Sequence, residues 1–314
     1  MLFSALFILG LVTTQAAVAP TAPTGAAIKV VAGNDVVADL VRAIAGQDVE
    51  LFVLGQGADP HHYEPTPADA KKIESADLVL EFGLGLDRAM GKLHRSTGSK
   101  AKLLVVAEGL AKKGSDAAVT DHADHADHDH NHDHGSSAVD PHIWHDPAQV
   151  RILNERMCAA LVAVSPASAE SFRSRSLELD TQLVKLDEWI KAQVLLIPES
   201  KRLLVTTHDG LQSFGNRYGF RVVGIEMTSD GADVAPSQLI KMVNALRETK
   251  SAVVFGDAAH HSRIAATVAR EANVRLIETL RLDSLLQPPA VEQGKAYLET
   301  MRLNVNTIVK ALQD

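Results

Sequence analysis

Fourteen consecutive residues of this chain, Asp121–His134, contain six histidines and five aspartates. Neutral imidazole is the commonest nitrogen ligand for zinc-like metals, and carboxylates add charged oxygen ligands. A run of this composition cannot bury an apolar face, so we expect a solvated loop that binds metal ions weakly and in several registers. The alternative is a charged loop with no role in metal binding. The auxiliary ligands expected in the loop are His122, His125, His128, His130, His132 and His134.

The triplet Asp-Pro-His occurs on both sides of this run. It stands at Asp59–His61 in the segment DPHHYEP and at Asp140–His142 in the segment DPHIWHD. The repetition suggests that His61 and His142 aim their imidazoles at one metal ion, with the His/Asp run collecting metal in front of it. Their neighbours, His62 and His145, are the rival candidates, and we interpret them as surface or supporting residues.

The apolar pattern of the chain predicts the elements that position these side chains. A stripe of Leu and Ile at steps of three and four marks a long helix, which we expect to span roughly 45 Å at about 1.5 Å per residue. Short apolar strands alternate with helices on both sides of it. The strands are expected at residues 28–32, 49–54, 78–82, 103–107, 203–207, 221–226, 252–255 and 274–278.

This order predicts an α/β fold with two lobes, each built on a mainly parallel four-stranded sheet. The first lobe is expected over residues 28–165, with the His/Asp-rich loop at 121–137 inside it. The linking helix is expected at 166–198, and the second lobe at 199–314.

Ligands of open α/β sheets bind beyond the carboxyl ends of the strands. His61 follows the second predicted strand, His208 follows the fifth, and Asp283 follows the last. Together with His142, they offer three nitrogens and one carboxylate, a set that can close a tetrahedral zinc site. Other readings remain open: a packed core histidine for His208 and a helix cap for Asp283. Glu226 and Asp257 also leave strand ends and are rival carboxylates, whereas His94, His260 and His261 fall in helical patterns and are expected to be solvated.

The net charge and the cysteine count exclude several classes of function and site. The 314 residues carry a net charge of −8, of which five negative charges lie in the His/Asp run, so the remainder is only about −3 and gives no sign of nucleic-acid binding. A single cysteine, Cys158, excludes an intramolecular disulfide and a cysteine-based zinc site, and its apolar surroundings predict burial.

The first 19 residues are expected to form a cleaved export signal. They carry no charged side chain, Leu2–Val12 is apolar, and Ala17–Ala19 fits the small-residue cleavage rule. The apolar stretch is short for a membrane span, and no cysteine follows the cleavage site to carry a lipid. We therefore expect a protein of the Gram-negative periplasm.

Four segments resemble the zinc/manganese solute-binding proteins of ABC importers, and most closely the ZnuA-like zinc branch. They are GADPHHYEPTPADAKKIESADLVLEFGLGLD, DPHIWHDP, TTHDGLQSFGNRYGF and LRLDSL followed by AYLETMRLNVNTIV. The resemblance runs from Ile28 to the C-terminus. It implies a metal between two lobes joined by one rigid helix, with His61, His142, His208 and Asp283 as ligands. The manganese branch carries Glu where this chain has His208, so zinc is expected rather than manganese. His145 is a departure, because the family usually has an apolar residue there.

The expected function is capture of Zn²⁺ in the periplasm and its delivery to a membrane permease. A periplasmic metal chaperone is a possible second partner, and a monomer is expected. The alternatives are a free-standing metal buffer and a secreted zinc hydrolase. A hydrolytic zinc needs an open coordination position, and the chain has no His-Glu-x-x-His helix. We therefore do not expect an enzyme.

Overall fold

The computed structural model describes residues 27–110, 140–225, 236–259 and 262–313. The expected export signal and the His/Asp-rich loop at 121–137 lie outside these residues. None of the described helices is long and apolar enough to cross a membrane.

The first lobe is a parallel sheet with the strand order β2-β1-β3-β4. The apolar residues of its two central strands, β1 and β3, are mostly buried, as expected for the inside of a parallel sheet. The helix α2 has Pro67 at its first position, and Thr66 and Asp69 form a reciprocal capping box at its start. The elements are β1 (Ile28–Ala32), α1 (Asp35–Ala45), β2 (Val49–Val53), α2 (Pro67–Glu74), β3 (Leu78–Glu81), α3 (Arg88–Thr97) and β4 (Lys102–Val105).

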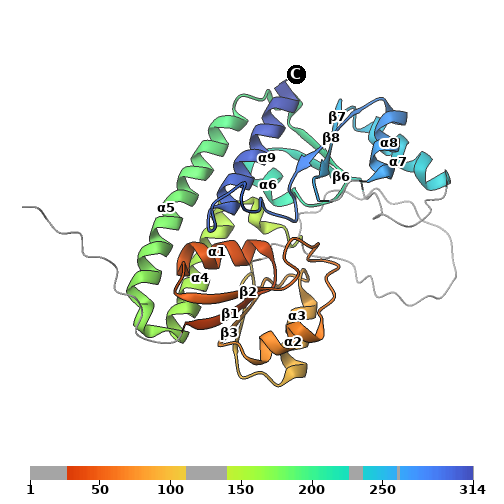
Figure 1. Ribbon diagram of the computed structural model, residues 1–314. Helices are drawn as coiled ribbons and strands as arrows, with labels where there is room; N and C mark the ends of the chain where they lie inside the picture. The colour runs from red at the N-terminus through yellow and green to blue at the C-terminus, as the bar shows by residue number, and fades with distance from the viewer. Residues whose placement is uncertain (1–26, 111–139, 226–235, 260–261, 314) are drawn as a thin grey trace, which may run out of the picture.

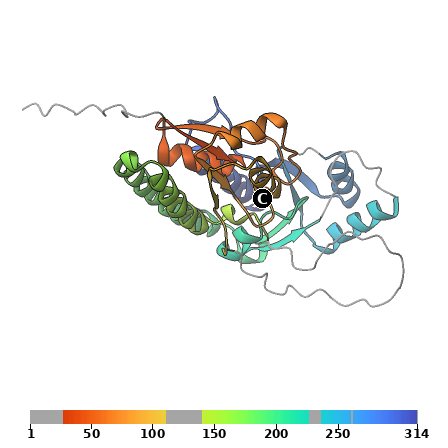
Figure 2. The ribbon, with the colours of Figure 1, turned by 90° about the horizontal axis from the view of Figure 1, so that it is seen from below.

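The second lobe repeats this architecture with the strand order β6-β5-β7-β8, again parallel. The helices α7 and α8 lie on the side of this lobe that is remote from α5 (Figure 1 and Figure 2). The elements are β5 (Leu203–Thr206), α6 (Gln212–Tyr218), β6 (Arg221–Gly224), α7 (Pro236–Glu248), β7 (Val253–Asp257), α8 (Arg263–Ala272), β8 (Arg275–Leu280) and α9 (Ala296–Gln313). The predicted fold of two α/β lobes with four-stranded parallel sheets is confirmed.

A long helix, α5 (Ala169–Val194), runs along one side of the molecule past both lobes, with α9 beside its later half (Figure 1). Its buried stripe is the predicted one, Leu179, Leu183, Leu186, Ile190 and Val194. It is shorter than predicted, because Pro166–Ser168 forms a separate 3₁₀ turn before it. Its 26 residues span about 39 Å.

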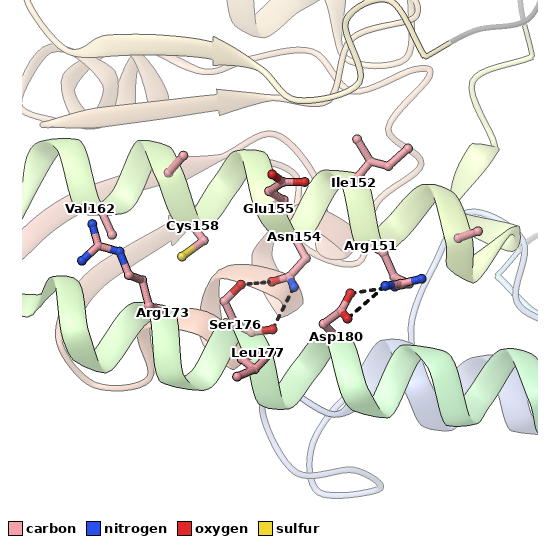
Figure 3. A pocket seen from close by; sticks show the side chains of 12 residues that line it. Arg151, Ile152, Asn154, Glu155, Cys158, Val162, Arg173, Ser176, Leu177 and Asp180 are labelled. Atoms are coloured by element: carbon pink, nitrogen blue, oxygen red, sulfur yellow. Dashed lines mark hydrogen bonds and ion pairs between the residues drawn. The ribbon is translucent and has the colours of Figure 1, made fainter.

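The helix α4 (Pro147–Val164) packs along α5 through polar as well as apolar contacts. Figure 3 shows Asn154 bonded to Ser176 and the paired ion bridge from Arg151 to Asp180. Cys158 lies on the same face of α4 and is buried, as predicted.

The two lobes share one apolar core. A continuous buried cluster runs from the first sheet through α4, α5 and α9 to Phe255 and Leu280 of the second sheet. Lobes that share a large apolar contact resist relative movement more strongly than lobes joined by a linker alone. We therefore expect the lobes to hold the residues between them in a fixed relative position.

Candidate metal centre

Four side chains that are far apart in the sequence converge between the lobes. His61 lies in the loop after β2, His208 follows β5, and Asp283 follows β8. His142 directly precedes the 3₁₀ turn η1 (Ile143–His145), which leads into α4. One nitrogen or oxygen atom from each of the four lies within 4.8 Å of the corresponding atom of every other. The parallel sheets explain this convergence, since the carboxyl ends of their strands face the gap between the lobes.

The repeated Asp-Pro-His triplet forms the same local turn twice. Oδ1 of Asp59 accepts a hydrogen bond from the backbone N–H of His61 at 2.8 Å. Oδ1 of Asp140 accepts one from the backbone N–H of His142 at 2.9 Å. An aspartate that bonds the backbone two residues ahead, with proline fixing φ between them, makes a rigid turn. The triplet thus holds the backbone of each histidine.

The distances suit a tetrahedral ion. Nε2 of His142 lies 3.1 Å from Nε2 of both His61 and His208, and 2.9 Å from Oδ1 of Asp283. The carboxylate oxygens of Asp283 lie 3.6 Å from Nε2 of His61 and 3.5 Å from Nε2 of His208. Tetrahedral zinc with bonds of about 2.0–2.1 Å separates its ligand atoms by about 3.3 Å. The four groups therefore fit one ion with only small shifts.

His142 is oriented by a carboxylate on the ring nitrogen that faces away from the centre. Its Nδ1 lies 2.7 Å from Oδ1 of Asp140, which leaves Nε2 facing the other three groups. A histidine ligand is commonly oriented in this way by a hydrogen bond from its second nitrogen. Burial tends to lower the pKa of His142, but hydrogen bonds to Asp140 and Asp283 outweigh it and raise the pKa to about 9.

The pKa values of Asp283 and His208 shift in directions that favour a bound cation. Burial raises the pKa of Asp283, but the nearby imidazoles of His142 and His61 outweigh it and hold the pKa well below its usual value. Burial lowers the pKa of His208, which keeps its imidazole neutral and available as a ligand. The centre thus offers an ionised carboxylate beside imidazole nitrogens.

The centre is more accessible at His61 and His208 than at its other two members. The side chains of His142 and Asp283 are 2% and 5% exposed, whereas those of His61 and His208 are 24% and 40% exposed. An ion would therefore approach past His61 and His208 and rest on the two buried groups.

The rival residues lie elsewhere. His62 is 77% exposed and pairs with Asp59, which agrees with a surface role. His145 is buried, and its Nε2 lies 3.0 Å from the carbonyl oxygen of Leu282 rather than in the cluster. Burial lowers the pKa of His145 to about 4, so the ring is neutral. The carboxylate of Asp257 accepts hydrogen bonds from the backbone N–H groups of Ala259 and Leu282.

The remaining predictions concern His94, Glu226, His260, His261 and the histidines of the His/Asp-rich loop. His94 is not simply solvated as predicted: its Nε2 lies 3.0 Å from the carbonyl oxygen of Ala101, a contact that its helical pattern does not reveal. Glu226, His260 and His261 fall outside the described residues, as do the six histidines of the His/Asp-rich loop.

Sequence reasoning missed the residues that hold the ligand loops. Asp59 and Asp140 act through the turns described above, and their only sequence signal was the repeated triplet. Asp35 of α1 accepts a hydrogen bond from the backbone of Gly57, in the loop that carries His61, and another from Gln287 of the second lobe. Nothing in the local sequence around Asp35 reveals this second contact, because its partner lies 252 residues away.

Comparison with known proteins agrees with this arrangement. Residues 30–311 match the protein family described as "Zinc-uptake complex component A periplasmic". The manganese-binding lipoprotein MntA of Bacillus subtilis is 30% identical over 292 residues, which cover 91% of this chain and 90% of MntA. The manganese ABC transporter substrate-binding lipoprotein PsaA of Streptococcus anginosus is 28% identical over 294 residues, or 93% and 91% of the two chains.

Solved structures of similar proteins have the same fold. The periplasmic zinc-binding protein TroA of Treponema pallidum superposes with a TM-score of 0.73 at 25% identity, over 91% of this chain and 99% of TroA. A manganese-bound mutant of a periplasmic metal-binding protein from Candidatus Liberibacter asiaticus gives a TM-score of 0.74 at 25% identity, over 90% and 98%.

Proposed function

Because this chain belongs to the family of periplasmic zinc-uptake components, the metal-binding solute-binding proteins of ABC importers, we propose that it captures Zn²⁺ between its lobes and delivers it to a membrane permease. The proposed ligands are His61, His142, His208 and Asp283. They form a cluster with suitable geometry in the part of the chain that the structure describes.

The choice of zinc rests on the donor set. The names of similar proteins include both manganese and zinc, so they do not decide between the two metals. Three imidazoles and one carboxylate suit zinc, whereas Mn²⁺ favours oxygen donors. The observation that carries the proposal is the position of His208, whose Nε2 supplies a third nitrogen 3.1 Å from that of His142.

The arrangement also favours transport over hydrolysis. Four protein ligands complete a tetrahedral shell, and a hydrolytic zinc instead keeps one position for water. The exposed imidazoles of His61 and His208 form the open side through which the ion would enter and leave. We propose that the two buried groups, His142 and Asp283, stay in place while the ion is exchanged.

We further propose that the His/Asp-rich loop collects zinc in the Gram-negative periplasm and passes it to this centre. The support is its composition, six imidazoles among fourteen residues. We propose that the protein is a monomer. A periplasmic metal chaperone would exchange zinc with it through this loop.

Calorimetry tests the proposed function. The metal-free protein should bind one equivalent of zinc tightly and further equivalents weakly. Deletion of residues 121–134 should remove only the weak equivalents, because the four proposed ligands lie elsewhere. Absence of a tight equivalent in the wild-type protein would defeat the proposal, and its loss on deletion would defeat the division of labour between loop and centre.

Zinc affinity should rise with pH between 7 and 9. The metal and a proton compete for Nε2 of His142, whose pKa in the metal-free protein is about 9. Apparent affinity should therefore increase about tenfold per pH unit in this range and level off above it. The same proton stabilises the metal-free fold, a contribution present below the ordinary histidine pKa and lost as pH rises through 9.

Chelator competition at several pH values measures this dependence, and calorimetry in buffers of different ionisation enthalpy counts the released proton. The Asp140→Asn variant is the control, since its His142 loses the carboxylate partner and the pH dependence should move to lower pH. An affinity that stays constant from pH 7 to 9 would contradict the assignment of the proton to His142.

A further inference from the structure

The backbone of Leu282, which precedes Asp283, is held at both its carbonyl oxygen and its N–H. The carbonyl oxygen of Leu282 accepts hydrogen bonds from Nε1 of Trp144 at 3.1 Å and from Nε2 of His145 at 3.0 Å. The backbone N–H of Leu282 donates a hydrogen bond to the carboxylate of Asp257. Leu282 itself is completely buried. The backbone that aims Asp283 at the metal centre is therefore fixed by three side chains, none of which belongs to the proposed ligand set.

Two of these side chains come from the segment that carries another ligand. Trp144 and His145 lie in the turn η1, directly after His142. That segment and the Leu282 carbonyl lie 137 to 138 residues apart in the sequence. The hydrogen bonds therefore join two ligand loops, one leading into α4 and one leaving β8. The relative position of His142 and Asp283 is set through this carbonyl even before an ion binds.

The turn η1 is itself anchored. The hydroxyl of Tyr297 on α9 donates to the carbonyl oxygen of Trp144 at 2.8 Å. The ring of Trp144 packs edge-on against Phe82 and also contacts the ring of His142. These contacts leave little freedom for the donors on Trp144 and His145, so movement of the Leu282 carbonyl would break their hydrogen bonds.

His145 is the informative member of this group. Its side chain is only 2% exposed, and an imidazole in such surroundings is costly unless its polar atoms are bonded. An apolar side chain would fill the space but leave the Leu282 carbonyl with a single donor. The imidazole thus adds a directional contact that apolar packing cannot supply.

We propose that His145 is a positioning residue for metal retention: with Trp144 it holds the Leu282 carbonyl and so keeps Asp283 in place opposite His142 when no ion is bound. This inference rests on the proposed function, because it concerns the same centre. Preorganised ligands lose less freedom on binding, and an ion held by them leaves more slowly. Loss of the His145 donor should therefore accelerate release of zinc.

The test is the rate of zinc release into excess chelator, measured by stopped flow on the full chain. Replacing His145 with leucine removes the donor and should accelerate release about tenfold, the effect expected for one net hydrogen bond. Replacing His145 with glutamine restores an N–H donor and should bring the rate back to within about threefold of wild type. This rescue separates a directional contact from a merely structural role.

His94→Leu is the matched control. Like His145, His94 directs Nε2 at a backbone carbonyl, 3.0 Å away, but its partner Ala101 lies at the amino end of β4, whereas the metal centre lies beyond the carboxyl ends of the strands. The same chemical change there should leave the release rate unchanged. Trp144→Phe removes the second donor and should also accelerate release, which keeps the test available if His145→Leu does not fold.

The possible outcomes distinguish this inference from the function on which it rests. A wild-type protein that fails to retain zinc would defeat the proposed function and the inference with it. Retention of zinc with equal release rates in wild type, His145→Leu and Trp144→Phe would overturn the inference alone. Acceleration that glutamine does not relieve would also overturn it, since packing rather than the donor would then be responsible.

Discussion

Replacing His142 with alanine should weaken zinc binding by more than about 100-fold. Four-ligand structural zinc sites bind with about 10–16 kcal/mol, so loss of one ligand should cost on the order of 3 kcal/mol. Nε2 of His142 lies 2.9 to 3.1 Å from a donor atom of each of the other three groups, so its loss removes the central member of the cluster. Competition with a chromophoric chelator measures the affinity.

His62→Ala is the control for this experiment. His62 lies next to the proposed ligand His61 in the sequence, but its side chain is 77% exposed and pairs with Asp59. Its replacement should leave zinc affinity within about twofold of wild type, as expected for a surface substitution. Equal losses in the two variants would mean that any imidazole near the cleft suffices. An unchanged affinity in His142→Ala, with the fold intact by circular dichroism, would remove His142 from the ligand set.

Replacing His208 with glutamate should shift the metal preference from zinc towards manganese. The change converts a set of three nitrogens and one carboxylate into two nitrogens and two carboxylates, which Mn²⁺ favours. The side chain of His208 is 40% exposed, so the new carboxylate can be accommodated without burying an unpaired charge. We expect the ratio of zinc to manganese affinity to fall by about 100-fold, measured by calorimetry with each metal.

His208→Gln separates the loss of imidazole from the gain of charge. His208→Gln should weaken the binding of both metals, whereas His208→Glu should weaken zinc binding and strengthen manganese binding. A ratio that stays at the wild-type value in His208→Glu would contradict the view that position 208 sets the metal preference.

The sequence predicts which four side chains converge because the proposed ligands follow strand ends or belong to a repeated triplet. His61, His208 and Asp283 each leave a strand whose apolar pattern is plain, and parallel sheets bring such ends together. His142 was identified by the Asp-Pro-His repeat, which the structure explains as a turn that holds the backbone of the histidine.

The features that the sequence could not predict depend on distant partners. The start of the last helix, α9, at Ala296 is one example. Asp39 of α1 accepts hydrogen bonds from the backbone N–H of Tyr297 in the first turn of α9 and from that of Gly294 just before it, 258 and 255 residues away in the sequence. No local capping residue marks that start. The contact of His145 with Leu282, 137 residues away in the sequence, escapes sequence reasoning for the same reason.

The shared core has a consequence for metal exchange. Apolar side chains pack without interruption from the first lobe to the second, so large separation of the lobes would expose buried surface. Exchange of the ion through movement of the partly exposed proposed ligands, His61 and His208, would expose less buried surface. This agrees with an open side formed by those two residues.

The central claim is that four side chains close the coordination shell of one zinc ion between the lobes. The most direct measurement is a crystal structure of the zinc-loaded protein with anomalous data at the zinc edge. We predict one strong peak bound by Nε2 of the three histidines at about 2.0–2.1 Å and by a carboxylate oxygen of Asp283 at about 2.0–2.2 Å. A peak remote from His208 or Asp283, or an ion whose fourth ligand is a water open to substrate, would contradict it.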